Sequence, residues 1–114
     1  MLPKDYRLKK RSAFAATYRT GQVFHFGGIT LFAGKKKEND NPTKVGFVVS
    51  KKIHKRAVKR NRIKRLMRES YRLLIKENSV KTKYMSLIFV ASAKLLEKDF
   101  KYIKNSVTKL VEKI

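Results

Sequence analysis

Apolar residues recur at three- and four-residue steps between residues 63 and 75 of this chain. The members of this stripe are Ile63, Leu66, Met67, Ser70, Tyr71, Leu74 and Ile75. Successive residues of a helix turn by about 100°, so these side chains share one face that other parts of the chain must cover. The pattern predicts a long amphipathic helix packed on a second layer.

Period-two alternation predicts strands on both sides of this helix. Between Val23 and Ala33, Ile29, Leu31 and Ala33 alternate with Thr30 and Phe32, and Gly27-Gly28 is interpreted as a bulge within that segment. Val45, Phe47 and Val49 alternate in the same way, and the run from Leu87 to Ala91 has the length of a buried strand. The stretch 35–42 is interpreted as a loop.

Two further helices complete the predicted order. One lies near residues 12–20, with Ser12 as its cap, Gly21 at its close, and Phe14 and Tyr18 on one face. The last carries the stripe Leu96, Phe100, Ile103, Val107, Leu110, Val111 and Ile114. The order is helix, two or three strands, helix, strand, helix. It predicts one domain over residues 1–114, an α/β two-layer sandwich with its helices mainly on one face of a small sheet.

Positive charge is concentrated just before and within the long helix. Residues 51–68 hold ten Lys or Arg and no acid, in a chain whose 30 basic and 8 acidic residues give a net charge of +22. A solvated helix surface normally mixes charges of both signs, and this one does not. The excess repels itself unless a polyanion neutralises it, so nucleic acid is the expected partner.

Other classes of function have little support in the sequence. There is no Cys and there are only two His, so thiol chemistry and a bound metal cofactor are not expected. An enzyme acting alone would need a converging nucleophile and base, which these residues do not offer. No apolar run reaches the roughly 18 residues of a membrane span, and residues 1–11 lack the apolar stretch of a signal peptide. A cytoplasmic protein without a membrane partner is expected.

The basic helix also carries a specific constellation. On a helical projection Asn61, Arg65 and Arg68 lie together with Arg72, opposite the apolar stripe. Guanidinium groups bind phosphate and base edges through two parallel hydrogen bonds, and the amide of Asn61 both donates and accepts. The Arg60-Asn61-Arg62 trio therefore indicates recognition of RNA in addition to charge neutralisation.

At these residues the chain resembles the protein subunit of bacterial ribonuclease P. The resemblance rests on the segments 45–52 (VGFVVSKK) and 60–69 (RNRIKRLMRE), with Tyr6-Arg7-Leu8, Phe14, Tyr18 and Gly21 upstream and Leu87 to Ala91 downstream. It covers nearly the whole chain. It implies a fold like domain 2 of ribosomal protein S5, in the order αβββαβα.

The resemblance implies a subunit that binds the catalytic RNA of ribonuclease P, one to one, and the 5′ leader of precursor tRNA. The RNA and its magnesium ions cleave the leader, and the protein contributes no catalytic residue. The positions implied to face the catalytic RNA are Ser50, Lys51, Lys52, Arg60, Asn61, Arg62, Lys64, Arg65 and Arg68. Those implied to line a central cleft for the leader are Phe14, Tyr18 and Phe32.

Some alternatives stay open at this point. A ribosomal protein or general RNA chaperone would share the charge and fold class, although the VSKK and RNRIKR segments favour ribonuclease P. From the residues alone, core packing is the commoner fate of the three aromatic residues, whereas the resemblance favours partial exposure in a groove. Three positions depart from the family pattern. This chain has His54, Ser86 and Ser92 where members of the family often have Gly, Asp and a basic residue, respectively. Roles of the last two positions are not carried over, and His54 is expected to be neutral and structural or a phosphate neighbour.

Overall fold

The computed structural model describes residues 3–19, 22–38, 41–77, 80 and 82–114. Along the chain the elements are η1 (Lys4–Tyr6), α1 (Arg11–Arg19), β1 (Gln22–Phe26), β2 (Ile29–Ala33), β3 (Lys44–Val48), α2 (Ala57–Lys76), β4 (Ser86–Ala91), η2 (Ala93–Glu97) and α3 (Phe100–Glu112). Apart from two short 3-10 helices, this is the predicted order αβββαβα.

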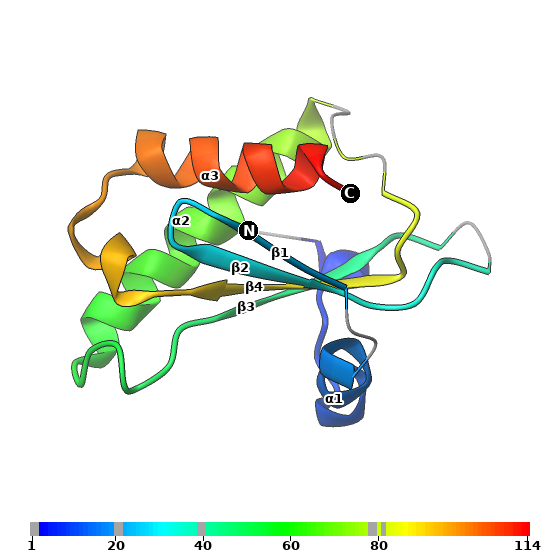
Figure 1. Ribbon diagram of the computed structural model, residues 1–114, viewed down its shortest axis with the longest axis horizontal. Helices are drawn as coiled ribbons and strands as arrows, with labels where there is room; N and C mark the ends of the chain where they lie inside the picture. The colour runs from blue at the N-terminus through cyan, green and yellow to red at the C-terminus, as the bar shows by residue number, and fades with distance from the viewer. Residues whose placement is uncertain (1–2, 20–21, 39–40, 78–79, 81) are drawn as a thin grey trace.

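The four strands form one mixed sheet in the order β1-β2-β4-β3. Strands β1 and β2 pair antiparallel, as do β2 and β4, whereas β3 and β4 are parallel and α2 connects them. In Figure 1 α2 and α3 cover one face of the sheet, and the short α1 lies on the opposite side. The predicted sandwich is confirmed, with α1 as the element outside its helical layer.

The glycine pair at 27–28 is a hairpin turn, so the predicted bulge is wrong. Strands β1 and β2 are two strands joined by these residues, with Phe26 paired to Ile29. Gly27 and Gly28 have φ angles of 58° and 91°, as the two central residues of a type I′ turn require. Alternation continues on both sides of the turn, so periodicity alone did not separate the two strands.

The core lies between the sheet and the pair α2 and α3. On α2 the buried residues are Ile63, Met67, Ser70, Tyr71 and Leu74, as the apolar stripe predicts. They meet Phe89 of β4, whose ring stacks on that of Phe47 with centroids 5.6 Å apart. The ring of Tyr71 lies 5.7 Å from that of Phe89. The basic surface of α2 therefore faces away from the core.

Two helix boundaries differ from the prediction. Helix α1 begins at Arg11, and the carbonyl of Lys10 accepts the first hydrogen bonds from Ala13 and Phe14. Ser12 thus lies inside the first turn and is not the cap, and Gly21 falls outside the described residues. Helix α3 begins at Phe100, where the Asp99 carboxylate accepts a hydrogen bond from the Tyr102 amide, so Leu96 belongs to η2.

Candidate nucleic-acid interface

Helix α1 crosses the face of the sheet that α2 and α3 leave uncovered. Strand register places Val23, Phe32, Ile88 and Gly46 in one row across β1, β2, β4 and β3. Alternation puts this row on the face opposite the core. The ring of Phe14 lies over Gly46, where an added Cβ would come within 2.5 Å of its Cζ. The glycine thus lets α1 approach the sheet closely.

The three predicted aromatic residues come together on this face. Phe14 and Tyr18 extend from α1, and Tyr18 meets Phe32 of β2 edge to face, with ring centroids 4.9 Å apart. Tyr18 is 40% exposed, and Phe14 and Phe32 are half-buried. Partial burial also raises the pKa of Tyr18, so its hydroxyl stays protonated at neutral pH. These rings are therefore not core residues, and we call the partly exposed surface that they form on this face the aromatic cleft.

Beside this row lies a second row that the sequence prediction missed. His25, Thr30, Val90 and Val48 align across the four strands, and the His25 Nδ1 lies 3.1 Å from the Thr30 hydroxyl. They extend the floor of the aromatic cleft toward the end of β3. The signal was present, since His25 alternates with Val23, but it is informative only once β1 is known to be a separate strand.

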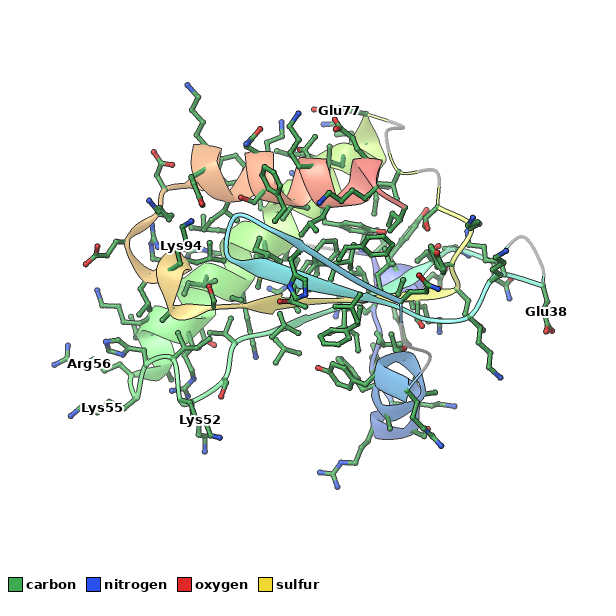
Figure 2. The ribbon with its side chains drawn as sticks, in the orientation of Figure 1. Glu38, Lys52, Lys55, Arg56, Glu77 and Lys94 are labelled. Carbon is green, nitrogen blue, oxygen red and sulfur yellow. The ribbon has the colours of Figure 1, made fainter. Side chains whose placement is uncertain are left out.

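The basic turn follows directly at the end of β3. Ser50, Lys51 and Lys52 are exposed, and the Ser50 hydroxyl accepts a hydrogen bond from the Lys52 amide. The His54 Nδ1 accepts a hydrogen bond from the Arg56 amide at 3.0 Å, which holds the imidazole ring within the turn. In Figure 2 the side chains of Lys52, Lys55 and Arg56 project from this end of the molecule.

Two of the arginines predicted to face RNA also hold the protein together. The Arg60 guanidinium donates to the carbonyls of His54 and Lys55, at 2.8 and 2.9 Å, and thereby ties the turn to α2. Arg62 donates to the carbonyl of Lys98 at 3.0 Å and links α2 to the segment before α3. These contacts depend on loops that are remote from the helical pattern, so the pattern did not predict them.

The other residues of α2 that were predicted to face RNA form a ridge along the helix. Asn61 and Arg65 are exposed and Lys64 and Arg68 are half-buried, with no salt bridge to any of them in the described parts of the chain. Further along, Arg72 pairs with Glu69 through two hydrogen bonds. This pairing lowers the pKa of the Glu69 carboxyl. We call Asn61, Lys64, Arg65 and Arg68 the basic ridge.

The two predicted sets of residues thus form neighbouring surfaces. The row of His25 and Val48 leads from the aromatic cleft to the turn at Ser50, and α2 begins just beyond that turn. The residues the structure describes contain no cluster of three or more His, Asp or Glu able to hold a metal ion. Among the described helices, none combines the length and apolar character needed to cross a membrane.

Comparison with known proteins identifies the relatives of this chain. The sequence pattern of the ribonuclease P family matches residues 2–114. The ribonuclease P protein component of Clostridium novyi is 38% identical over 112 residues, which cover 98% of this chain and 96% of that protein. The ribonuclease P protein component of Thermoanaerobacter sp. is 39% identical over 113 residues, which cover 99% of this chain and 92% of that protein.

Solved structures agree with the sequence relatives. The ribonuclease P protein of Staphylococcus aureus superposes with a TM-score of 0.78 at 28% identity, over 96% of this chain and 94% of that one. The ribonuclease P protein of Thermotoga maritima, solved with 1-(4-fluorophenyl)-2-thiourea, superposes with a TM-score of 0.80 at 23% identity, over 95% of this chain and 99% of that one. The chain therefore belongs to the ribonuclease P family, as the protein component of a ribonucleoprotein enzyme that binds RNA and processes tRNA.

Proposed function

We propose that the two neighbouring surfaces hold two different RNAs. The basic ridge, with the turn at Ser50, Lys51 and Lys52, docks on the catalytic RNA, and the aromatic cleft holds the 5′ leader of the precursor tRNA. The observation that carries the proposal is the continuity of these surfaces. A leader lying in the cleft ends beside the turn, next to the RNA that cuts it.

Exposed aromatic rings suit a single-stranded leader. Unpaired bases stack on such rings for about 1–3 kcal/mol each, with little preference for sequence. The 40% exposure of Tyr18 and the partial exposure of Phe14 and Phe32 support this role. A cleft of this kind accepts leaders of unrelated sequence, which an enzyme acting on many precursor tRNAs needs.

The basic ridge suits a structured RNA. Its guanidinium groups can each bind one phosphate through two hydrogen bonds, and Asn61 can donate to and accept from a base edge. We further propose that one protein binds one catalytic RNA, that magnesium ions held by that RNA perform the hydrolysis, and that the complex works in the cytoplasm. The protein's contribution is then binding energy for the precursor and better use of magnesium by the RNA.

The first test is cleavage of a precursor tRNA by a bacterial ribonuclease P RNA at low magnesium concentration. We expect the protein to restore correct 5′ maturation, and Phe14→Ala to raise KM for long leaders but not for a leader of one nucleotide. Phe26→Ala, at a partly exposed ring beside Lys113 and outside the aromatic cleft, is the matched control. Equal KM effects on the two leaders would refute the cleft as the leader site, and tight RNA binding without activation would favour an RNA chaperone.

A further inference from the structure

A cavity of about 430 Å³ lies along the flank of α1 that the aromatic cleft does not use. On α1 it is lined by Ala13, Ala16 and Thr17, whereas Phe14 and Tyr18 are not among its lining residues. Its other walls come from the end of β2 and the starts of β3 and β4. Figure 2 shows Glu38, at its rim, at the opposite end of the molecule from Lys52. We call this cavity the distal pocket.

Backbone hydrogen bonds that continue the sheet beyond its strands hold the rim of this pocket. The Gly34 amide donates to the carbonyl of Ser86 at 2.9 Å, and the Met85 amide donates to that of Lys35 at 2.8 Å. The Lys44 amide in turn donates to the Met85 carbonyl at 3.1 Å. Lys35, Met85 and Lys44 are therefore fixed side by side, and the rim is preformed.

The lining combines an apolar floor with a positive rim. Leu8, Ala13, Ala16 and Met85 supply the apolar surface, and Met85 is 50% exposed. Lys35 and Lys44 supply the charge, and neither is in a salt bridge among the described residues. Glu38 is the one acid in the lining. Such a site fits a flat apolar ring that carries a negative group, because a thioether packs well on an aromatic edge.

Hydroxyl groups in the wall define a hydrogen-bond acceptor. The Thr17 hydroxyl donates to the Ala13 carbonyl at 2.8 Å and lies 2.7 Å from the Ser86 hydroxyl. Since the Thr17 proton is already used, Ser86 must donate to Thr17, which leaves lone pairs on Ser86. The pocket can therefore accept one hydrogen bond from an N–H group on the edge of a ring.

We propose that the distal pocket binds one nucleotide of single-stranded RNA, with its base against Met85 and its phosphates on Lys35 and Lys44. The inference rests on the proposed leader role of the aromatic cleft and extends the leader path to the other flank of α1. Arg11 and Arg19 are exposed on α1 and supply phosphate contacts for a chain that crosses the helix. A long leader thus occupies both flanks and a short one only the cleft.

Methionine methyl groups provide a direct readout in the full-length protein. With 13C-methyl methionine, the Met85 signal reports on the distal pocket. The signal of Met67, a fully buried residue on the core face of α2, reports on the core. We expect a long single-stranded leader RNA to shift the Met85 signal but not that of Met67. A short leader RNA should shift the ring signals of Phe14 and Tyr18 and leave Met85 unchanged.

Variants separate the pocket from the cleft. We expect Lys35→Ala with Lys44→Ala to weaken binding of the long leader RNA about fivefold or more, because two phosphate contacts are lost. Binding of the short leader RNA, which does not reach the pocket, should change little. Ala16→Leu, at an exposed helical position, should fill the pocket and give the same selective loss. Lys76→Ala with Lys101→Ala removes equal charge from the exposed ends of α2 and α3, on the other side of the sheet, without breaking a salt bridge among the described residues, and is the control.

Other outcomes would overturn specific parts of the inference. Ring shifts without a Met85 shift, or equal losses in the pocket and control variants, would refute the distal pocket and leave the cleft intact. Absence of both shifts would refute the leader proposal itself. If adenosine monophosphate shifts Met85 at concentrations as low as the RNA does, the pocket binds free nucleotides and is not part of a leader path.

Discussion

Glu69 is the single acid among residues 51–76. It accepts two hydrogen bonds from the Arg72 guanidinium, which is therefore not available to bind a phosphate. We expect Glu69→Gln to tighten binding to the catalytic RNA and to steepen its log–log salt dependence by about 0.7–0.9, the contribution of one further phosphate contact. Binding measured across a salt series tests this. Glu97→Gln makes the same charge change on η2, and an equal gain there would attribute the effect to net charge alone.

The lowered pKa of Glu69 also predicts a pH response. A carboxyl whose pKa is lowered in the folded protein contributes stability above its ordinary pKa and loses it as the pH falls through the lowered value. The Glu69–Arg72 pair therefore stays ionised throughout the neutral range. We expect the difference in RNA affinity between wild type and Glu69→Gln to be constant from pH 6 to 8, and a difference that vanishes toward pH 6 would contradict the pairing.

Arg60 and Arg65 differ in what their loss should do. Arg60→Ala removes the hydrogen bonds to the turn carbonyls, so we expect both weaker RNA docking and a free energy of unfolding lower by about 1 kcal/mol. Arg65→Ala should weaken docking with little change in stability, because Arg65 is exposed and outside the turn. Thermal unfolding beside RNA titration separates them, and equal stability of the two variants would refute the structural role of Arg60.

At the scale of elements, local patterns predicted what depends on local sequence. The stripe from Ile63 to Ile75 specified α2 because its period is set by helix geometry, and the basic ridge followed from the same projection. The hairpin at Gly27 was missed because alternation continues across a two-residue turn. The distal pocket could not be predicted, since Lys35, Lys44 and Met85 meet only through pairing of distant strands.

The close packing of α1 on the sheet depends on Gly46, which lies under the Phe14 ring. Gly46→Ala would place a methyl group 2.5 Å from the Phe14 ring, so α1 must shift, at a cost of about 1–3 kcal/mol for overpacking. We expect weaker binding of long-leader precursors and unchanged docking on the catalytic RNA. Gly28→Ala strains the turn between β1 and β2 instead, outside the distal pocket and away from α1, and an identical loss in both variants would show general destabilisation.

For the whole molecule, repulsion among positive charges is the main force that opposes the folded state. The chain carries a net charge of +22, and the ion pairs within the described residues are Arg72–Glu69, Lys104–Glu77 and Lys109–Glu112. The core under α2 must therefore hold the fold against repulsion among the remaining cations. Multivalent anions that bind the folded surface should stabilise it by mass action.

We therefore expect sulfate to raise the midpoint of thermal unfolding more than chloride does at the same ionic strength. Circular dichroism follows the loss of helix in both salts. Screening alone acts equally at matched ionic strength, so equal midpoints would show that no anion site contributes. A reduced sulfate effect in Arg65→Ala with Arg68→Ala, but not in Lys76→Ala with Lys101→Ala, would place the stabilising anions on the basic ridge, where the catalytic RNA is proposed to dock.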